Sequence, residues 1–160
     1  TTKEPDLSFV NRVDSMDSDA DVVVVFGGTN DFGHGDAKLG TFESRDPYTF
    51  YGAMHVLCEK LINRFPNADI LFMTPLHRCS EDEVSKENGL PEETNLAGYV
   101  SIIREVAEFY GLPVLDLFST SGLQPKVDII KETYMPDGLH PSDAGALRIA
   151  RRLIGFLQTL

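Results

Sequence analysis

Three short apolar runs along the chain have the pattern of buried strands. Residues 21–26 form a continuous β-branched run closed by two glycines, residues 68–74 form a second run closed by Pro75, and residues 113–117 form a third. Runs of this length with apolar residues at successive positions are typical of parallel strands that are covered on both faces. The pattern therefore predicts a parallel sheet.

Between these runs, apolar residues recur three and four positions apart, which is the spacing of a helix with one buried face. The periodicity predicts helices over residues 50–65, 99–109 and 142–157, and a first helix over residues 6–16. Gly111 is placed to end the second of these helices, because glycine adopts the left-handed backbone geometry of a helix C-cap.

Strands and helices alternate along the chain, so we expect an α/β protein, a three-layer α/β/α sandwich with a flavodoxin-like doubly wound parallel sheet. The 160 residues and 42% hydrophobic content suit a single domain over residues 1–160. Only three strands are visible, whereas such a sheet usually has about five. Because the chain opens in mid-pattern at Thr1 without an initiator methionine, we expect the missing part to be N-terminal.

The charge balance excludes several classes of partner. The 14 basic and 25 acidic residues give a formal net charge of −11, which repels nucleic-acid phosphates and anionic membrane surfaces. No apolar run approaches the roughly 18 residues that a membrane span requires. Because no signal peptide is visible, we expect a cytoplasmic protein. Cys58 and Cys79 are too few for a disulfide framework, so we expect free thiols.

Residues 27–31, Gly-Gly-Thr-Asn-Asp, follow the first predicted strand. Doubly wound sheets bind ligands at the carboxyl ends of their strands, so this turn is a candidate pocket wall. Its glycines allow backbone geometry that a side chain forbids, which leaves Asn30 free to aim its amide N–H into the crevice beside Gly28 and Thr29. The alternative is a turn that is merely rich in turn-forming residues.

A second constellation, Asp137-Gly-Leu-His140-Pro, comes shortly before the last predicted helix. A histidine here projects from a loop, and a carboxylate three residues upstream can accept the Nδ1 proton and leave Nε2 as a base. The alternative is an exposed loop histidine with Asp137 as a turn former. His34, after the Asn30 turn, and His77, after the second predicted strand, are further candidates for the pocket wall; the default for each is a polar surface residue.

The Gly-x-Asn-Asp after a valine-rich strand, followed by Asp-x-x-His-Pro before a C-terminal helix, resembles the third and fifth conserved blocks of the SGNH/GDSL hydrolases. The resemblance implies an α/β/α fold and hydrolysis of an ester or thioester through an acyl-serine intermediate, without metal or cofactor. It also implies that Asn30 donates to the oxyanion, that His140 is the general base and then acid, and that Asp137 orients His140. Gly28 would let the backbone approach the substrate, for which a small acyl ester is our first expectation.

The family's Gly-Asp-Ser block, which carries the nucleophile, has no counterpart in this chain, and neither does its oxyanion-hole glycine. Ser119 and Ser121 follow the third predicted strand, but their surroundings resemble no nucleophile turn. We therefore expect that a first strand-helix-strand unit of about 30 residues or more is absent. Its first strand would lie beside residues 22–26, and this chain alone would be inactive.

Two other functions stay open. A metal-dependent phosphoesterase would use ligand types that the chain supplies, although no metal-ligand spacing is repeated; the candidates are Asn30, Asp31, His34, His77, Asp137 and His140. A noncatalytic ligand-binding domain would need no serine, but the presence of both His140 and Asp137 argues against it. Residues 78–93 are polar enough to be either a lid over a pocket or a solvated loop.

Overall fold

The computed structural model describes residues 8–34, 38–82 and 95–160. Within these residues three parallel strands form one sheet in the order β1-β2-β3, with β1 at Val22–Phe26, β2 at Asp69–Met73 and β3 at Val114–Leu115. The predicted parallel sheet is therefore confirmed. Each of its strands coincides with a predicted apolar run, although β3 is shorter than its run.

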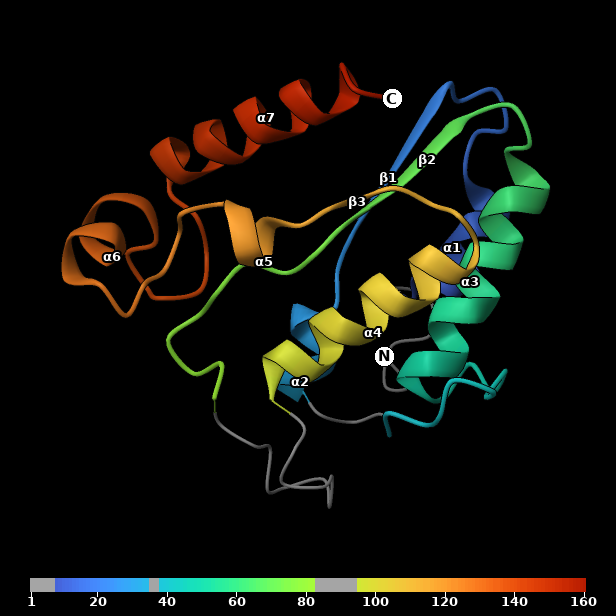
Figure 1. Ribbon diagram of the computed structural model, residues 1–160, viewed down its shortest axis with the longest axis horizontal. Coiled ribbons are helices and arrows are strands. Elements are labelled where there is room, and N and C mark those ends of the chain that lie inside the picture. Colours follow the sequence, from blue (N-terminus) through green and yellow to red (C-terminus); the bar gives the residue numbers. More distant parts are fainter. Residues whose placement is uncertain (1–7, 35–37, 83–94) are drawn as a thin grey trace.

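Helices cover both faces of the sheet (Figure 1). On one face, the core is formed by Val23, Ile70 and Phe72 of the strands with residues of α1 (Phe9–Arg12), the 3-10 helix η2 (Val13–Ser15), α3 (Phe50–Arg64) and α4 (Leu96–Phe109). On the other face, Leu71, Met73 and Leu115 pack against α6 (Asp128–Tyr134) and α7 (Asp143–Leu157). The expected α/β sandwich is confirmed.

Capping groups define where the predicted helices begin and end. Thr49, Asn95 and Ser142 cap α3, α4 and α7, and each side chain accepts a hydrogen bond from a backbone amide three residues on. Gly111 follows α4 at a φ of 67°. The amides of Gly111 and Leu112 donate to the carbonyl oxygens of Glu108 and Ala107, which is a Schellman C-cap. The expected role of Gly111 is confirmed.

Two local predictions need correction. The third strand was predicted to reach Leu117, but it ends at Leu115, because the Asp116 side chain accepts the Ser119 amide and starts the short helix α5 (Leu117–Thr120). The helix predicted over residues 6–16 is split into α1 and η2, and residues 1–7 lie outside the described residues. Neither of the cysteines is in a disulfide, as expected.

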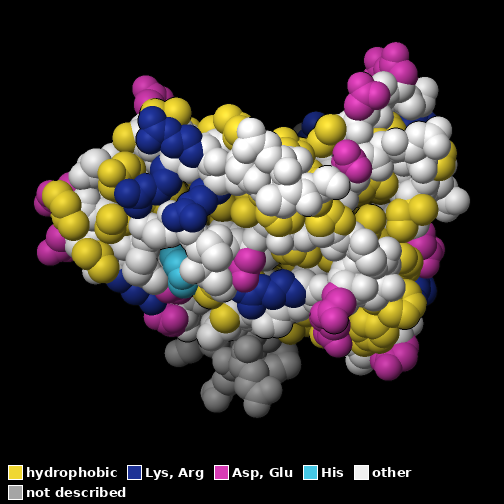
Figure 2. All heavy atoms as spheres, turned by 45° about the horizontal axis from the view of Figure 1, so that its top comes forward, with side chains coloured by type: hydrophobic (Ala, Val, Ile, Leu, Met, Phe, Trp, Pro, Cys, Tyr) yellow, Lys and Arg dark blue, Asp and Glu magenta, His cyan; other side chains and the backbone are white. Residues whose placement is uncertain are grey.

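Strand β1 is one of the two edge strands of the described sheet. Val22, Val24 and Phe26 are 44%, 40% and 43% exposed, although Leu71 and Met73, the partners of Val24 and Phe26 in β2, face the core under α7. Figure 2 shows hydrophobic side chains exposed on the side of the molecule that carries α7, where Leu147 and Ile154 are also exposed. The free edge lies where we expect the missing strand.

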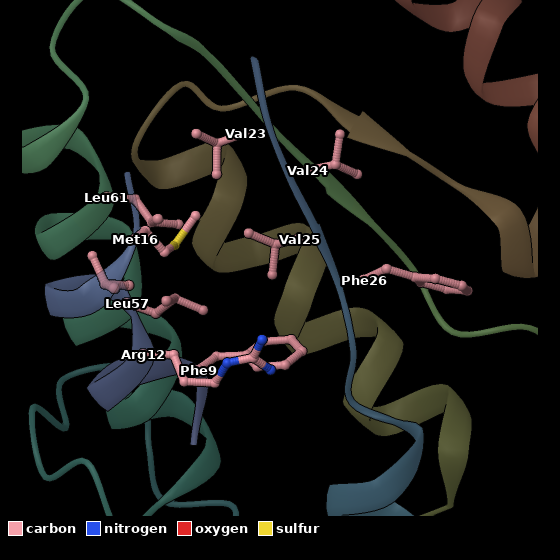
Figure 3. A pocket seen from close by; sticks show the side chains of 10 residues that line it. Phe9, Arg12, Met16, Val23, Val24, Val25, Phe26, Leu57 and Leu61 are labelled. Carbon is pink, nitrogen blue, oxygen red and sulfur yellow. The ribbon is translucent and has the colours of Figure 1, made fainter. Parts of the chain in front are cut away.

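A cavity of about 300 Å³ borders the same strand. Its walls are residues 23–26 of β1 and side chains of α1, η2 and α3 (Figure 3). Val23 and Val25 point toward the helices, whereas Val24 and Phe26 point the opposite way. Because successive side chains on both faces border one cavity, the backbone edge of β1 must open onto it.

No described helix is long and apolar enough to cross a membrane.

Candidate active site

Asn30 lies at the carboxyl end of β1, in the first turn of α2 (Thr29–His34). The helix starts directly after Gly28, whose carbonyl oxygen accepts the Phe32 amide at 3.1 Å. The Asn30 residue is exposed, and its side chain has no hydrogen bond to another described residue. Its amide group is therefore available to a ligand at this edge of the sheet.

Gly28 makes the abrupt start of α2 possible. Its φ is 102°, and a Cβ there would lie 3.1 Å from Ile103 Cδ1 and 3.3 Å from Pro75 Cγ. Glycine is needed for both the backbone angle and the close packing. Gly28 is buried, so its described surroundings are core side chains.

Asp137 and His140 form a hydrogen-bonded pair in the turn before α7. Nδ1 of His140 lies 2.6 Å from Oδ2 of Asp137, while the amides of Leu139 and His140 donate to Oδ1 at 2.8 Å and 2.7 Å. The bond from the His140 ring, followed by the two backbone amides, holds the pKa of Asp137 far below its usual range. The ionised carboxylate thus accepts the Nδ1 proton and leaves Nε2 as the basic nitrogen.

The loop after β2 joins the turns that carry Asn30 and His140. Nη1 of Arg78 lies 3.3 Å from the carbonyl oxygen and 3.4 Å from Oγ1 of Thr29, the neighbour of Asn30. The guanidinium carbon lies 5.4 Å from the centroid of the Phe32 ring. One residue later, the amide of Cys79 donates to the carbonyl oxygen of Gly138 at 2.9 Å. Two adjacent residues thus fix both candidate turns to one loop.

His77 lies in the same loop and is partly buried. Its Nδ1 is 2.6 Å from Oε2 of Glu81, and its ring stacks on Phe118 at a centroid distance of 3.9 Å. His34, the last residue of α2, is exposed and precedes residues outside the description. His77 is therefore anchored at the carboxyl edge, whereas His34 lies exposed at the end of α2.

The two serines considered as nucleophiles have other partners. Ser121 is 1% exposed, and its Oγ accepts the Leu123 amide at 3.2 Å. Oγ of Ser119 accepts from the guanidinium of Arg104 at 2.9 Å. Among the described residues, neither serine is hydrogen-bonded to a histidine, so neither has a general base to activate it.

Sequence reasoning missed Glu81 and Arg78. Residues 78–93 were expected to form a lid or a solvated loop, but the Glu81 side chain is only 8% exposed; residues 83–94 lie outside the described part of the chain. Over the described ranges, no group of three or more His, Cys, Asp or Glu side chains could hold a metal ion.

Comparison with known proteins gives a consistent result. The chain matches the GDSL-like lipase/acylhydrolase family over residues 2–148. No curated protein matches it. One crystal structure superposes with a TM-score of 0.86 at 38% identity, covering 98% of this chain and 73% of that one.

Two further solved structures resemble the chain. A protein from Lactobacillus plantarum gives a TM-score of 0.84 at 32% identity, covering 94% of this chain and 72% of that one. A putative GDSL-like lipase from Bacteroides ovatus gives 0.67 at 24% identity, covering 97% of this chain and 61% of that one.

Proposed function

This chain belongs to the GDSL-like lipase/acylhydrolase family, and we propose that it carries the general base and an oxyanion donor of an esterase that acts through an acyl-serine intermediate. The family is one of hydrolases of the esterase and lipase type. The observation that supports the proposal most is the 2.6 Å contact between Asp137 and His140, which leaves Nε2 of an exposed imidazole as a base.

In the proposed reaction, a serine hydroxyl attacks the ester carbonyl carbon while Nε2 of His140 takes the hydroxyl proton. The resulting imidazolium is stabilised by Asp137 and then gives the proton to the leaving alcohol oxygen. A water molecule attacks the acyl-serine with the same help from His140, which releases the acid and restores the serine. Asp137 stays ionised throughout, in keeping with its lowered pKa.

Asn30 is proposed to stabilise the oxyanion that forms at each attack. Its exposed amide group lies at the carboxyl end of β1, on the same loop-linked edge as the His140 turn. A fixed N–H donor is worth more to the charged intermediate than to the neutral carbonyl, so it lowers the barrier. Gly28, Thr29, His34 and His77 are the proposed pocket wall, with Gly28 acting through the turn geometry that it permits.

We assign the nucleophilic serine to a segment outside these 160 residues. The free edge of β1, its exposed Val24 and Phe26, and the cavity along residues 23–26 suit an additional strand covered by a helix. The related crystal structure of which this chain covers 73% holds more residues than the chain does. A strand added beside β1 would end at the same edge as Asn30.

The proposal is tested by comparing the 160-residue chain with a version extended upstream, using p-nitrophenyl butyrate as substrate. We expect negligible turnover by the chain alone, turnover by the extended protein, and its loss in His140→Ala. Turnover by the repurified 160-residue chain would contradict the external nucleophile. A folded extended protein without turnover would favour the noncatalytic binding domain.

A further inference from the structure

His77 and Glu81 form a second histidine–carboxylate pair that the proposed mechanism does not use. The separation of Nδ1 and the carboxylate oxygen is 2.6 Å, the same as between His140 and Asp137. The two pairs differ in exposure, because the His77 side chain is 22% exposed and that of His140 is 75% exposed. A histidine that is so enclosed has a defined orientation.

The Glu81 carboxylate is ionised although it is buried. Oε1 accepts from Lys126 Nζ at 3.0 Å and from Gln124 Nε2 at 3.1 Å, and Oε2 accepts from the Arg78 amide at 3.2 Å. Burial raises the pKa of Glu81, but the hydrogen bonds from Lys126, His77, Gln124 and the Arg78 amide outweigh it, so the pKa lies below its ordinary value. An ionised Glu81 is an acceptor only, so Nδ1 of His77 carries a proton and Nε2 is the atom left for a ligand.

A second contact, with the ring of Phe118, fixes the orientation of the His77 imidazole. The rings of His77 and Phe118 have centroids 3.9 Å apart and an interplanar angle of 34°. The backbone of Phe118 is anchored, because its amide donates to Oγ1 of Thr74 at 2.9 Å. The direction of Nε2 is therefore set before any substrate binds, which is the property of a recognition group.

The loop that carries His77 is bonded to the His140 turn through Cys79 and Gly138. In the proposed mechanism His140 protonates the leaving alcohol, so the alcohol part of the ester lies toward that turn. A hydroxyl both donates and accepts, and it can pair with Nε2 of either a neutral or a protonated imidazole. An alkyl group can do neither.

We infer that Nε2 of His77 binds a free hydroxyl group on the alcohol part of the substrate, so that the enzyme prefers esters of polyols to esters of simple alcohols. Glu81 and Phe118 are positioning residues for this contact. The inference rests on the proposed esterase function and adds to it the class of alcohol that is recognised.

The test uses the extended protein and two butyrate esters with the same carbon skeleton: glycerol 1-monobutyrate, which has two free hydroxyls, and propyl butyrate, which has none. His77→Phe keeps a ring against Phe118 but removes Nε2. We expect it to lower kcat/KM for the glycerol ester about tenfold more than kcat/KM for propyl butyrate, since the loss of one hydrogen bond to a buried group is typically worth that much.

His77→Asn is the second variant, because its short amide can still donate to Glu81 but does not reach the place of Nε2. We expect the same loss of preference for the glycerol ester. An equal fall for both esters in these variants, or an unchanged preference, would overturn the inference and leave the esterase proposal intact. Failure of the unmodified extended protein to hydrolyse either ester would overturn the proposed function and this inference with it.

Discussion

The backbone amide of Cys79 donates a hydrogen bond to the carbonyl oxygen of Gly138, and the side chain of Cys79 fills the space where Gly138 has no Cβ. The φ of Gly138 is 77°, and a Cβ there would lie 2.5 Å from Sγ of Cys79. Gly138 lies between Asp137 and His140 in sequence, so this contact sets the position of the proposed base relative to the loop after β2.

Gly138→Ala is therefore expected to harm both stability and catalysis. Gly111→Ala is the matched control, because Gly111 has a φ of 67° and nothing within 4 Å of its added Cβ. The control should cost about 1–2 kcal/mol, the penalty of a left-handed residue with a side chain, and leave kcat unchanged. Gly138→Ala should lower the free energy of unfolding, measured in urea, by more than the control does, and it should also lower kcat. An equal loss of unfolding free energy in the two variants would contradict the tight contact with Cys79.

Asn30 is tested by replacing its donor. Asn30→Ala should lower kcat about 10²–10³-fold, as for the loss of one oxyanion-hole donor. Asn30→Asp keeps the size but places a carboxylate near the oxyanion, so it should be at least as damaging. The control is Asn63→Asp. Asn63 is exposed on α3, and its side-chain amide donates to the Glu59 carbonyl oxygen. A folded Asn30→Asp protein that keeps more than about a tenth of the kcat would refute the oxyanion role.

Arg78 is expected to act on the rate through the position of Thr29 and Asn30. Arg78→Met removes the bonds to Thr29 and should lower kcat about tenfold with little change in KM, because a small displacement of a catalytic group is costly. Arg64→Met is the control: Arg64 also donates to a backbone carbonyl oxygen, that of Met16, and lies over Phe65, but at the other end of β2. A similar fall in kcat in both variants would show a general loss of stability instead.

The lowered pKa of Asp137 predicts a pH-dependent contribution to stability. Since the folded-state pKa lies below the unfolded value, ionised Asp137 favours the folded state above pH about 4, the ordinary carboxyl pKa. The contribution is lost as the pH falls through the folded value. The difference in free energy of unfolding between the original chain and Asp137→Asn should shrink between pH 5 and pH 2 in urea titrations. A constant difference would contradict the lowered pKa.

We expect the edge of β1 to be exposed in the 160-residue chain and covered in the extended protein. Val24→Lys should change the stability of the 160-residue chain by about 1 kcal/mol or less, because Val24 is 40% exposed. In the extended protein the proposed added elements cover Val24, so the lysine should cost at least about 2 kcal/mol more. Ile129→Lys, at a 64% exposed site on α6, should have the same small effect in both. Equal effects of Val24→Lys in the two proteins would argue against the covering.

Local patterns were sufficient for the parts of the fold with a strong periodic face. Strands β1 and β2 are short runs of apolar residues, α3 and α4 each bury one side, and α7 packs a partly buried apolar side against the sheet, so composition and spacing predict them. Helix α6 was not predicted, because it has no buried residue and thus no apolar period. The Asp137–His140 pair was predictable for a similar reason, since the two partners are three residues apart.

The rest of the site depends on contacts that sequence spacing does not encode. In the sequence Glu81 is one of several charged residues in a polar stretch. Two of the partners that stabilise its buried carboxylate, Gln124 and Lys126, lie more than 40 residues away. Arg78 likewise reaches Thr29 across 49 positions. Such partners meet only after the strands are paired, and a single sequence contains no direct sign of them.

Strand β1 also makes the isolated chain prone to self-association. Val22–Phe26 is a β-branched and aromatic segment without charge or proline, and one backbone edge of it is unpaired in the described sheet. Two copies can satisfy these edges by pairing with each other, and the exposed side chains of Val24 and Phe26 would then be buried between them. At high concentration the 160-residue chain is therefore expected to form dimers and larger aggregates through this edge, in competition with any segment that completes the sheet.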